Sequence, residues 1–132
     1  MTQDESHLRM LSIFHYVLAA PAALFASLFL MHFFFGVAIL GGLLDSSGKD
    51  APPPFLGAFM MAIGGAVVMM GWAFAGCLVF AGRSLASRKR YTVCLVIAGL
   101  ECVFCNPLGT VLGVFTIVVL MRPTVKQLFG AT

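Results

Sequence analysis

Charged side chains are scarce in this sequence. Asp, Glu, Lys and Arg together make up 10% of its 132 residues, against about a quarter in an average soluble domain. Hydrophobic residues make up 61%, and the mean hydropathy is +1.03. Because a water-soluble domain of this size cannot bury so much apolar surface, the composition predicts an integral membrane protein.

Only four cysteines occur, and the familiar catalytic motifs are missing. The four cysteines all lie in apolar stretches, so a disulfide-stapled secreted scaffold is not expected. The sequence contains no phosphate-binding loop, nucleophile elbow or HExxH zinc motif. We therefore expect no enzyme activity, no catalytic residue, no cofactor and no metal.

Three apolar stretches dominate the chain. They run from Met10 to Leu44, from Phe55 to Gly82 and from Tyr91 to Met121, and Glu101 and Asn106-Pro107 interrupt the last of them. About 20 helical residues suffice to cross a hydrocarbon core of about 30 Å, so each stretch is long enough to do so.

The positions of the basic residues predict how often the chain crosses. They gather in the connector 83–90 and after Met121, as Arg83, Arg88, Lys89, Arg90, Arg122 and Lys126. Positive charge beside apolar helices is typical of cytoplasmic segments. Because membrane topology explains the basic residues, we expect no nucleic-acid partner. Both segments lie on one side only if the chain turns back within its last apolar stretch. Asn106 and Pro107 are the natural turn, because proline lacks an N–H and disfavours helix at the residue before it.

The predicted fold class is therefore all-α. We expect a single transmembrane domain over residues 1–132, an integral membrane four-helix bundle with both termini cytoplasmic. Two long helices are predicted at about 9–40 and 55–82, and two short ones at about 90–105 and 108–122. The expected location is therefore a membrane that the chain crosses several times.

Small residues recur where helices could pack closely. Gly57, Gly64 and Gly71 follow one another at seven-residue spacing, and Gly109 and Gly113 form a GxxxG motif. Lipid tails are as apolar as leucine, so membrane helices associate through close backbone approach at such positions. The pattern predicts tight packing but leaves open whether the partner helix belongs to the same chain.

Glu101 is the one acidic residue inside an apolar stretch. It lies about 16 Å along a helix from Arg90, the last basic residue of the connector 83–90. An intramembrane carboxyl marks either a proton or ion site or a hydrogen bond that stabilises packing. Candidate partners are His15 and Ser12 in the first helix and Thr110 and Thr116 in the fourth. Glu101, His15 and Thr110 form the candidate polar site.

Cys102 and Cys105 form a CxxC pair just before the predicted turn. A redox or metal role needs an accessible low-pKa thiolate or a second ligand pair, and the sequence offers no second pair. Apolar packing is therefore the favoured interpretation, and a thiol redox relay is the alternative.

Two blocks of the sequence, HLRMLSIFHYVLAA and NPLGTVLGVFTIVVLMRPTV, resemble small bacterial membrane proteins with four predicted spans and no assigned activity. The segment GTVLGVFTIVVLMRP is the most distinctive part of this resemblance. It implies a bacterial inner-membrane location and carries over no substrate or catalytic residue.

The leading hypothesis is a non-enzymatic membrane protein that self-associates or serves as an accessory subunit. Its expected partners are the lipid bilayer and either further copies of itself or another membrane protein. The alternative is an oligomeric channel or proton-coupled transporter that uses Glu101. The second alternative is the thiol redox relay through Cys102 and Cys105.

Overall fold

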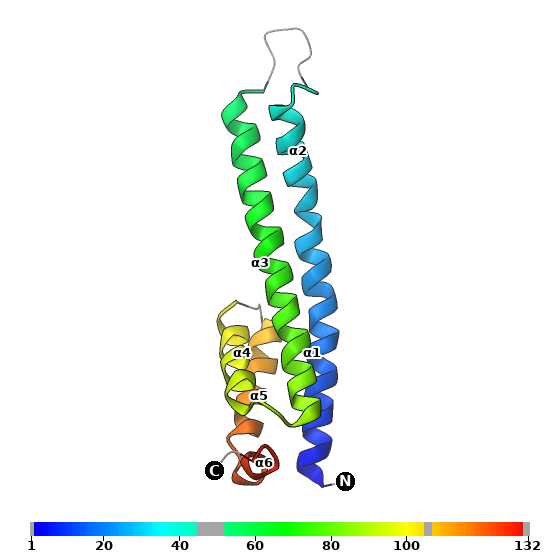
Figure 1. Ribbon diagram of the computed structural model, residues 1–132, viewed down its shortest axis with the longest axis vertical. Coiled ribbons are helices and arrows are strands. Elements are labelled where there is room, and N and C mark those ends of the chain that lie inside the picture. Colours follow the sequence, from blue (N-terminus) through cyan, green and yellow to red (C-terminus); the bar gives the residue numbers. More distant parts are fainter. Residues whose placement is uncertain (1, 45–51, 105–106, 131–132) are drawn as a thin grey trace. The chain divides into compact units, whose positions relative to one another are not determined.

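The computed structural model describes residues 2–44, 52–104 and 107–130, and every regular element in these ranges is an α-helix. The helices are α1 (Gln3–Leu28), α2 (Leu30–Leu40), α3 (Pro54–Ser87), α4 (Tyr91–Phe104), α5 (Pro107–Leu120) and α6 (Pro123–Leu128) (Figure 1). The fold is all-α with two long and two shorter apolar helices, as the sequence predicts.

The two long helices have the length and composition needed to cross a membrane. The first is Gln3–Leu40, because α1 and α2 are separated only by a turn at Phe29, and the second is Pro54–Ser87. With 38 and 34 residues, they extend about 57 and about 51 Å at 1.5 Å per residue.

The chain divides into two compact units, and both long helices contribute to each. The first unit contains residues 1–20 and 75–132, and the second contains residues 21–74.

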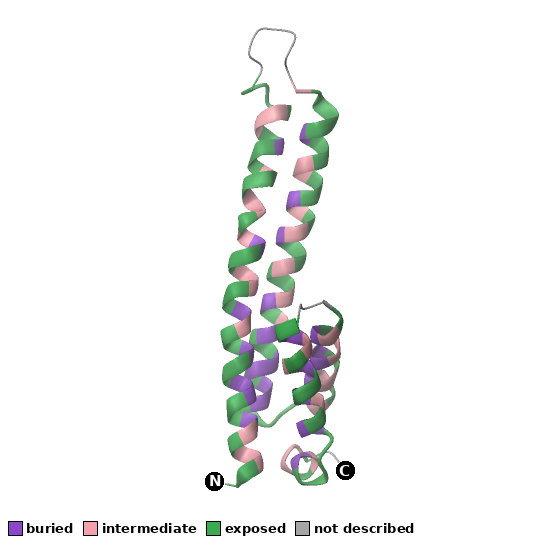
Figure 2. Ribbon diagram, turned by 180° about the vertical axis from the view of Figure 1, so that it is seen from behind, coloured by how far each residue is buried: buried purple, intermediate pink, exposed green. Residues whose placement is uncertain are grey.

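In the second unit, glycines bring the helix backbones into direct contact. A Cβ atom added to Gly36 of α2 would lie 2.5 Å from the backbone nitrogen of Met61, and one added to Gly64 of α3 would lie 2.7 Å from that of Phe33. Gly57 likewise faces Ile39, and Gly71 faces Ala26. Figure 2 shows buried positions along the sides of the two long helices that face each other. The helix that packs against the three regularly spaced glycines of α3 therefore belongs to the same chain.

In the first unit, α4 and α5 form an antiparallel pair. The Tyr91 hydroxyl at the start of α4 donates a hydrogen bond of 3.0 Å to the carbonyl of Leu120 at the end of α5. Gly113, in the middle of α5, packs against Ala98 and Cys102. Gly109, the other member of the GxxxG motif, is also buried. An apolar cluster lies beside this pair and contains Leu8, Leu11, Leu85, Cys94, Val119, Leu120 and Val125.

Helix α1 begins at Gln3, six residues before the predicted start. The Thr2 N–H donates to Glu5 Oε2 at 3.0 Å, and the Glu5 N–H donates to Thr2 Oγ1 at 3.4 Å. This reciprocal arrangement is a capping box, in which two side chains satisfy backbone N–H groups that have no partner within the helix. The polar opening of the chain is therefore helical.

Helix α3 continues to Ser87, five residues beyond the predicted end. Arg88 has φ +53, and the N–H groups of Arg88 and Lys89 donate to the carbonyls of Leu85 and Ser84 at 3.3 and 3.1 Å. These two bonds form a Schellman motif, which usually has glycine at the left-handed position. Arginine in that position concealed the helix end from sequence analysis.

The C-terminal segment contains α6, a helix that the sequence analysis left as a tail. Pro123 is its first residue, where proline is favoured because that N–H needs no helical partner, and Val125 is fully buried. The observed bounds of α4 and α5 differ from the predicted 90–105 and 108–122 by one or two residues, the usual uncertainty of a helix end. Pro107 begins α5, whereas Asn106 and Cys105 lie outside the described residues.

The glycine contacts predict opposite effects of two alanine substitutions. A Cβ atom at Gly113 would lie 2.5 Å from the carbonyl oxygen of Ala98, while one at Gly99 would meet nothing within 4 Å. We expect Gly113→Ala to destabilise the protein by about 1–3 kcal/mol, because backbone must move to admit the methyl group. Gly99→Ala, the matched control, should be neutral or stabilising by up to about 1 kcal/mol, since alanine favours helix.

Thermal unfolding of both variants in detergent, followed by circular dichroism, measures this difference. Equal midpoints for Gly113→Ala and Gly99→Ala would contradict the close approach of α4 and α5.

Candidate functional site

His15 lies on the buried face of α1. Leu8, Leu11, Ser12 and Ala19 share this face at helical spacing, and all four are buried. The ring is therefore held among side chains of the first unit, away from solvent.

Glu101 lies on the buried face of α4, one turn before the helix ends at Phe104. The sequence places Cys94, Ala98, Glu101 and Cys105 on one face, and the first three are almost fully buried. Cys105 lies outside the described residues. The neighbours of the carboxyl on its own helix are thus small groups, which leave room for a side chain from another helix.

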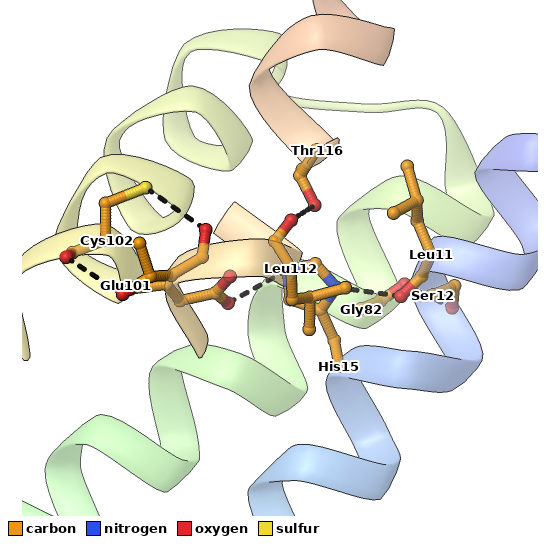
Figure 3. A network of polar contacts seen from close by, with 9 residues as sticks. Leu11, Ser12, His15, Gly82, Glu101, Cys102, Leu112 and Thr116 are labelled. Carbon is orange, nitrogen blue, oxygen red and sulfur yellow. Dashed lines mark hydrogen bonds and ion pairs between the residues drawn. The ribbon is translucent and has the colours of Figure 1, made fainter. Parts of the chain in front are cut away.

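The structure brings Glu101 and His15 into direct contact (Figure 3). Glu101 Oε1 lies 2.9 Å from His15 Nε2, and both side chains are 0% exposed. On the other side of the ring, Nδ1 lies 2.8 Å from the carbonyl oxygen of Leu11, one turn earlier in α1. The pair therefore connects α1 to α4 through a polar contact completely enclosed by protein.

The buried hydroxyl groups near the pair form hydrogen bonds with backbone carbonyls. Ser12 Oγ donates to the carbonyl of Gly82 in α3 at 2.7 Å, and Thr116 Oγ1 donates to that of Leu112 within α5 at 2.8 Å. The first bond joins α1 to α3, whereas the second is a bond to the preceding turn of the same helix, as serine and threonine commonly make. Both hydroxyl protons are thus engaged away from the carboxyl.

Thr110, the third predicted member of the site, contacts Cys102, the residue that follows Glu101. Its hydroxyl donates to the carbonyl of Cys102 at 3.4 Å, and the Cys102 thiol contacts the carbonyl of Thr110 at 3.9 Å. These reciprocal contacts join α5 to α4 at the residue that follows Glu101. Thr110 therefore helps to place the part of α4 that carries the carboxyl.

The cysteines of the described segments carry free thiols, at Cys77, Cys94 and Cys102. Within residues 2–44, 52–104 and 107–130, no group of three or more His, Cys, Asp and Glu side chains is placed to hold a metal ion. Because Cys105 is outside these ranges, the redox relay stays a prediction.

Two ion pairs lie at the surface of the first unit. Arg122 Nη1 is 3.2 Å from Asp4 Oδ1, and Arg88 Nη2 is 2.7 Å from Glu5 Oε1. A hydrogen bond from the Thr124 hydroxyl is the main cause that lowers the pKa of Asp4 below its usual value, and Arg122 adds to it. These contacts hold the start of α1 next to the segment that contains α6.

The pKa of Glu5 is lowered mainly by its hydrogen bond with the Thr2 backbone, and Arg88 adds to this effect. The native contacts of both surface carboxylates thus favour the ionised form. Their contribution to stability is present above the usual carboxyl pKa values and is lost as the pH falls through the lowered ones.

Sequence analysis found both members of the buried pair but missed the backbone partners of the buried polar side chains. Glu101 and His15 stood out because polar residues are rare in apolar stretches. The carbonyls of Leu11 and Gly82, which bind His15 and Ser12, carry no sequence signal, because every residue has a carbonyl group.

The chain matches no protein-family model, no curated protein and no solved structure.

The contact between His15 and Glu101 predicts that two substitutions of Glu101 differ sharply in their effect on the unfolding free energy. Glu101→Ala removes the polar group 2.9 Å from His15 Nε2 and leaves a cavity, so we expect a loss of about 2–4 kcal/mol in unfolding free energy. Glu101→Gln keeps the shape, and its amide N–H can donate to Nε2, so the loss should stay below about 1 kcal/mol.

Unfolding of both variants in mixed detergent micelles measures these losses. Equal stability of the alanine and glutamine variants would contradict the contact.

Proposed function

We propose that this chain is a non-enzymatic integral membrane protein that self-associates or serves as an accessory subunit. In this proposal the two long helices cross the bilayer, the two short helices enter it beside them, and both termini are cytoplasmic.

The distribution of side-chain size in the second unit supports the membrane location. Glycine and alanine lie between the helices, whereas large apolar side chains such as Leu24, Phe25 and Met69 face outward, with 70%, 65% and 76% of their surfaces exposed. Water would oppose this arrangement, because exposed apolar area costs about 25 cal/mol per Å². Lipid chains favour it, since they solvate large apolar groups and leave close backbone packing to small residues.

The charge distribution of the first unit supports cytoplasmic termini. Arg88, Lys89 and Arg90 connect α3 to α4, while Arg122 and Lys126 follow α5. The contact between Asp4 and Arg122 places the start of α1 beside the segment that joins α5 to α6. Basic clusters of this kind remain on the cytoplasmic side during insertion.

The single observation that carries self-association is the excess length of the long helices. Their apolar helical parts, 10–40 and 55–82, extend about 46 and about 42 Å at 1.5 Å per residue. Fitting them into a core of about 30 Å requires tilts of about 50° and 44°, above the roughly 40° upper limit of transmembrane helices. In this proposal another protein surface covers their outer ends, and a second copy of this chain offers the same apolar ends.

The buried contact between His15 and Glu101 favours a second candidate, a proton-coupled transporter. A carboxyl and an imidazole 2.9 Å apart, both fully enclosed, form a pair able to hold and pass a proton. Proton flux into liposomes that contain the purified protein distinguishes the candidates. An accessory subunit gives no flux above that of empty liposomes, while a transporter gives flux that Glu101→Gln abolishes.

Self-association through the outer ends predicts which side chains hold the subunits together. Phe34 and Phe55, at 63% and 73% exposed, lie near the outer ends, while Leu24, at 70%, lies nearer the middle of its helix. Removing a buried phenylalanine side chain costs about 1.5–3 kcal/mol. We therefore expect Phe34→Ala and Phe55→Ala each to weaken association about 10-fold or more, and the control Leu24→Ala to change it little.

Single-molecule subunit counting in liposomes, over a range of protein-to-lipid ratios, measures association. A wild-type protein that stays monomeric at every ratio contradicts self-association, and equal weakening by Leu24→Ala contradicts the proposed surface.

A further inference from the structure

The ring of His15 carries a proton on Nδ1. This nitrogen lies 2.8 Å from the carbonyl oxygen of Leu11, which can only accept a hydrogen bond. The Nδ1–H therefore donates to Leu11, and a neutral ring would present Nε2 as an acceptor. The protonation of one nitrogen is thus fixed by the backbone of α1, one turn before the ring.

A single proton must lie between the two side chains. Nε2 and Oε1 are 2.9 Å apart, and two lone pairs at that distance repel each other unless a proton joins them. Two arrangements satisfy this requirement. Either an imidazolium faces a carboxylate, or a carboxylic acid donates its O–H to a neutral ring.

The second carboxyl oxygen distinguishes these arrangements. Glu101 Oε2 is buried and has no hydrogen-bond donor among the described residues. The hydroxyls of Ser12 and Thr116 donate to backbone carbonyls instead. In a carboxylate this oxygen would carry about half of a buried negative charge with no donor, which is far more costly than burying the carbonyl oxygen of a neutral acid.

The place of Glu101 in its helix favours the same arrangement. The residue lies in the last turn of α4, which ends at Phe104. The C-terminal end of a helix carries partial negative charge from its unpaired carbonyl groups, so it disfavours an anion there. Among the described residues, no basic group other than His15 contacts the carboxyl, so no lysine or arginine stabilises an anion there.

We propose that Glu101 and His15 form a proton-binding site in which Glu101 is the uncharged carboxylic acid. Its O–H donates to Nε2 of His15, and the neutral ring donates its Nδ1–H to Leu11. The site therefore holds one exchangeable proton inside the first unit without any net or separated charge. The pair holds this proton whether the protein is an accessory subunit or a transporter.

Infrared spectroscopy of the protein in neutral buffer tests the proposal. A carboxylic acid gives a C=O stretching band that a carboxylate lacks, so the wild-type protein should show the intensity of one acid group per chain. Labelling glutamate with ¹³C should shift this band, and Glu101→Gln should abolish it. The matched control is Glu5→Gln, which removes an exposed carboxylate paired with Arg88 and should leave the band unchanged.

Nitrogen NMR of the histidine ring gives a second measurement that does not require a Glu101 variant. In a chain with His7→Gln and His32→Gln, the remaining ring signals come from His15. One protonated and one unprotonated nitrogen are expected. Two protonated nitrogens, together with no ¹³C-sensitive acid band, would establish the ion pair and overturn the proposal.

Discussion

The buried polar contact between His15 and Glu101 joins the first helix to the short antiparallel pair. It joins residues 86 positions apart in the sequence, and both side chains are 0% exposed. In an apolar environment such a contact has no competition from water, so separating the two helices would leave two polar groups without partners. Leu11, whose carbonyl binds the His15 ring, also belongs to the buried apolar cluster that contains Leu85 and Val119.

The second unit is held together in a different way. Within residues 21–74, the helices approach through Gly36, Gly57 and Gly64, and backbone atoms rather than polar side chains form the contact. A packing surface made from glycine gains dispersion contacts along its length and costs little side-chain entropy. The large apolar side chains, such as Leu24, Phe25 and Met69, are consequently directed outward.

Much of the architecture could be predicted from a few residues. The glycines at seven-residue spacing predicted a packing surface, and the rarity of polar residues in apolar stretches marked Glu101 and His15. The remainder depends on geometry that the sequence does not reveal. Arg88 has a left-handed backbone conformation at a position that glycine usually occupies. Pro123 begins a helix that is too short to show an apolar period. The carbonyl of Leu11 became relevant only when the ring orientation was known.

A double-mutant cycle tests most directly whether the bond between His15 and Glu101 holds α1 to α4. The unfolding free energies of His15→Ala, Glu101→Ala and the double variant are compared with that of the wild-type protein in the same detergent. We expect a coupling energy of about 1–3 kcal/mol, because each single substitution already removes the shared bond. Losses that add to within about 0.5 kcal/mol would mean that the two side chains contribute independently, and would contradict this account.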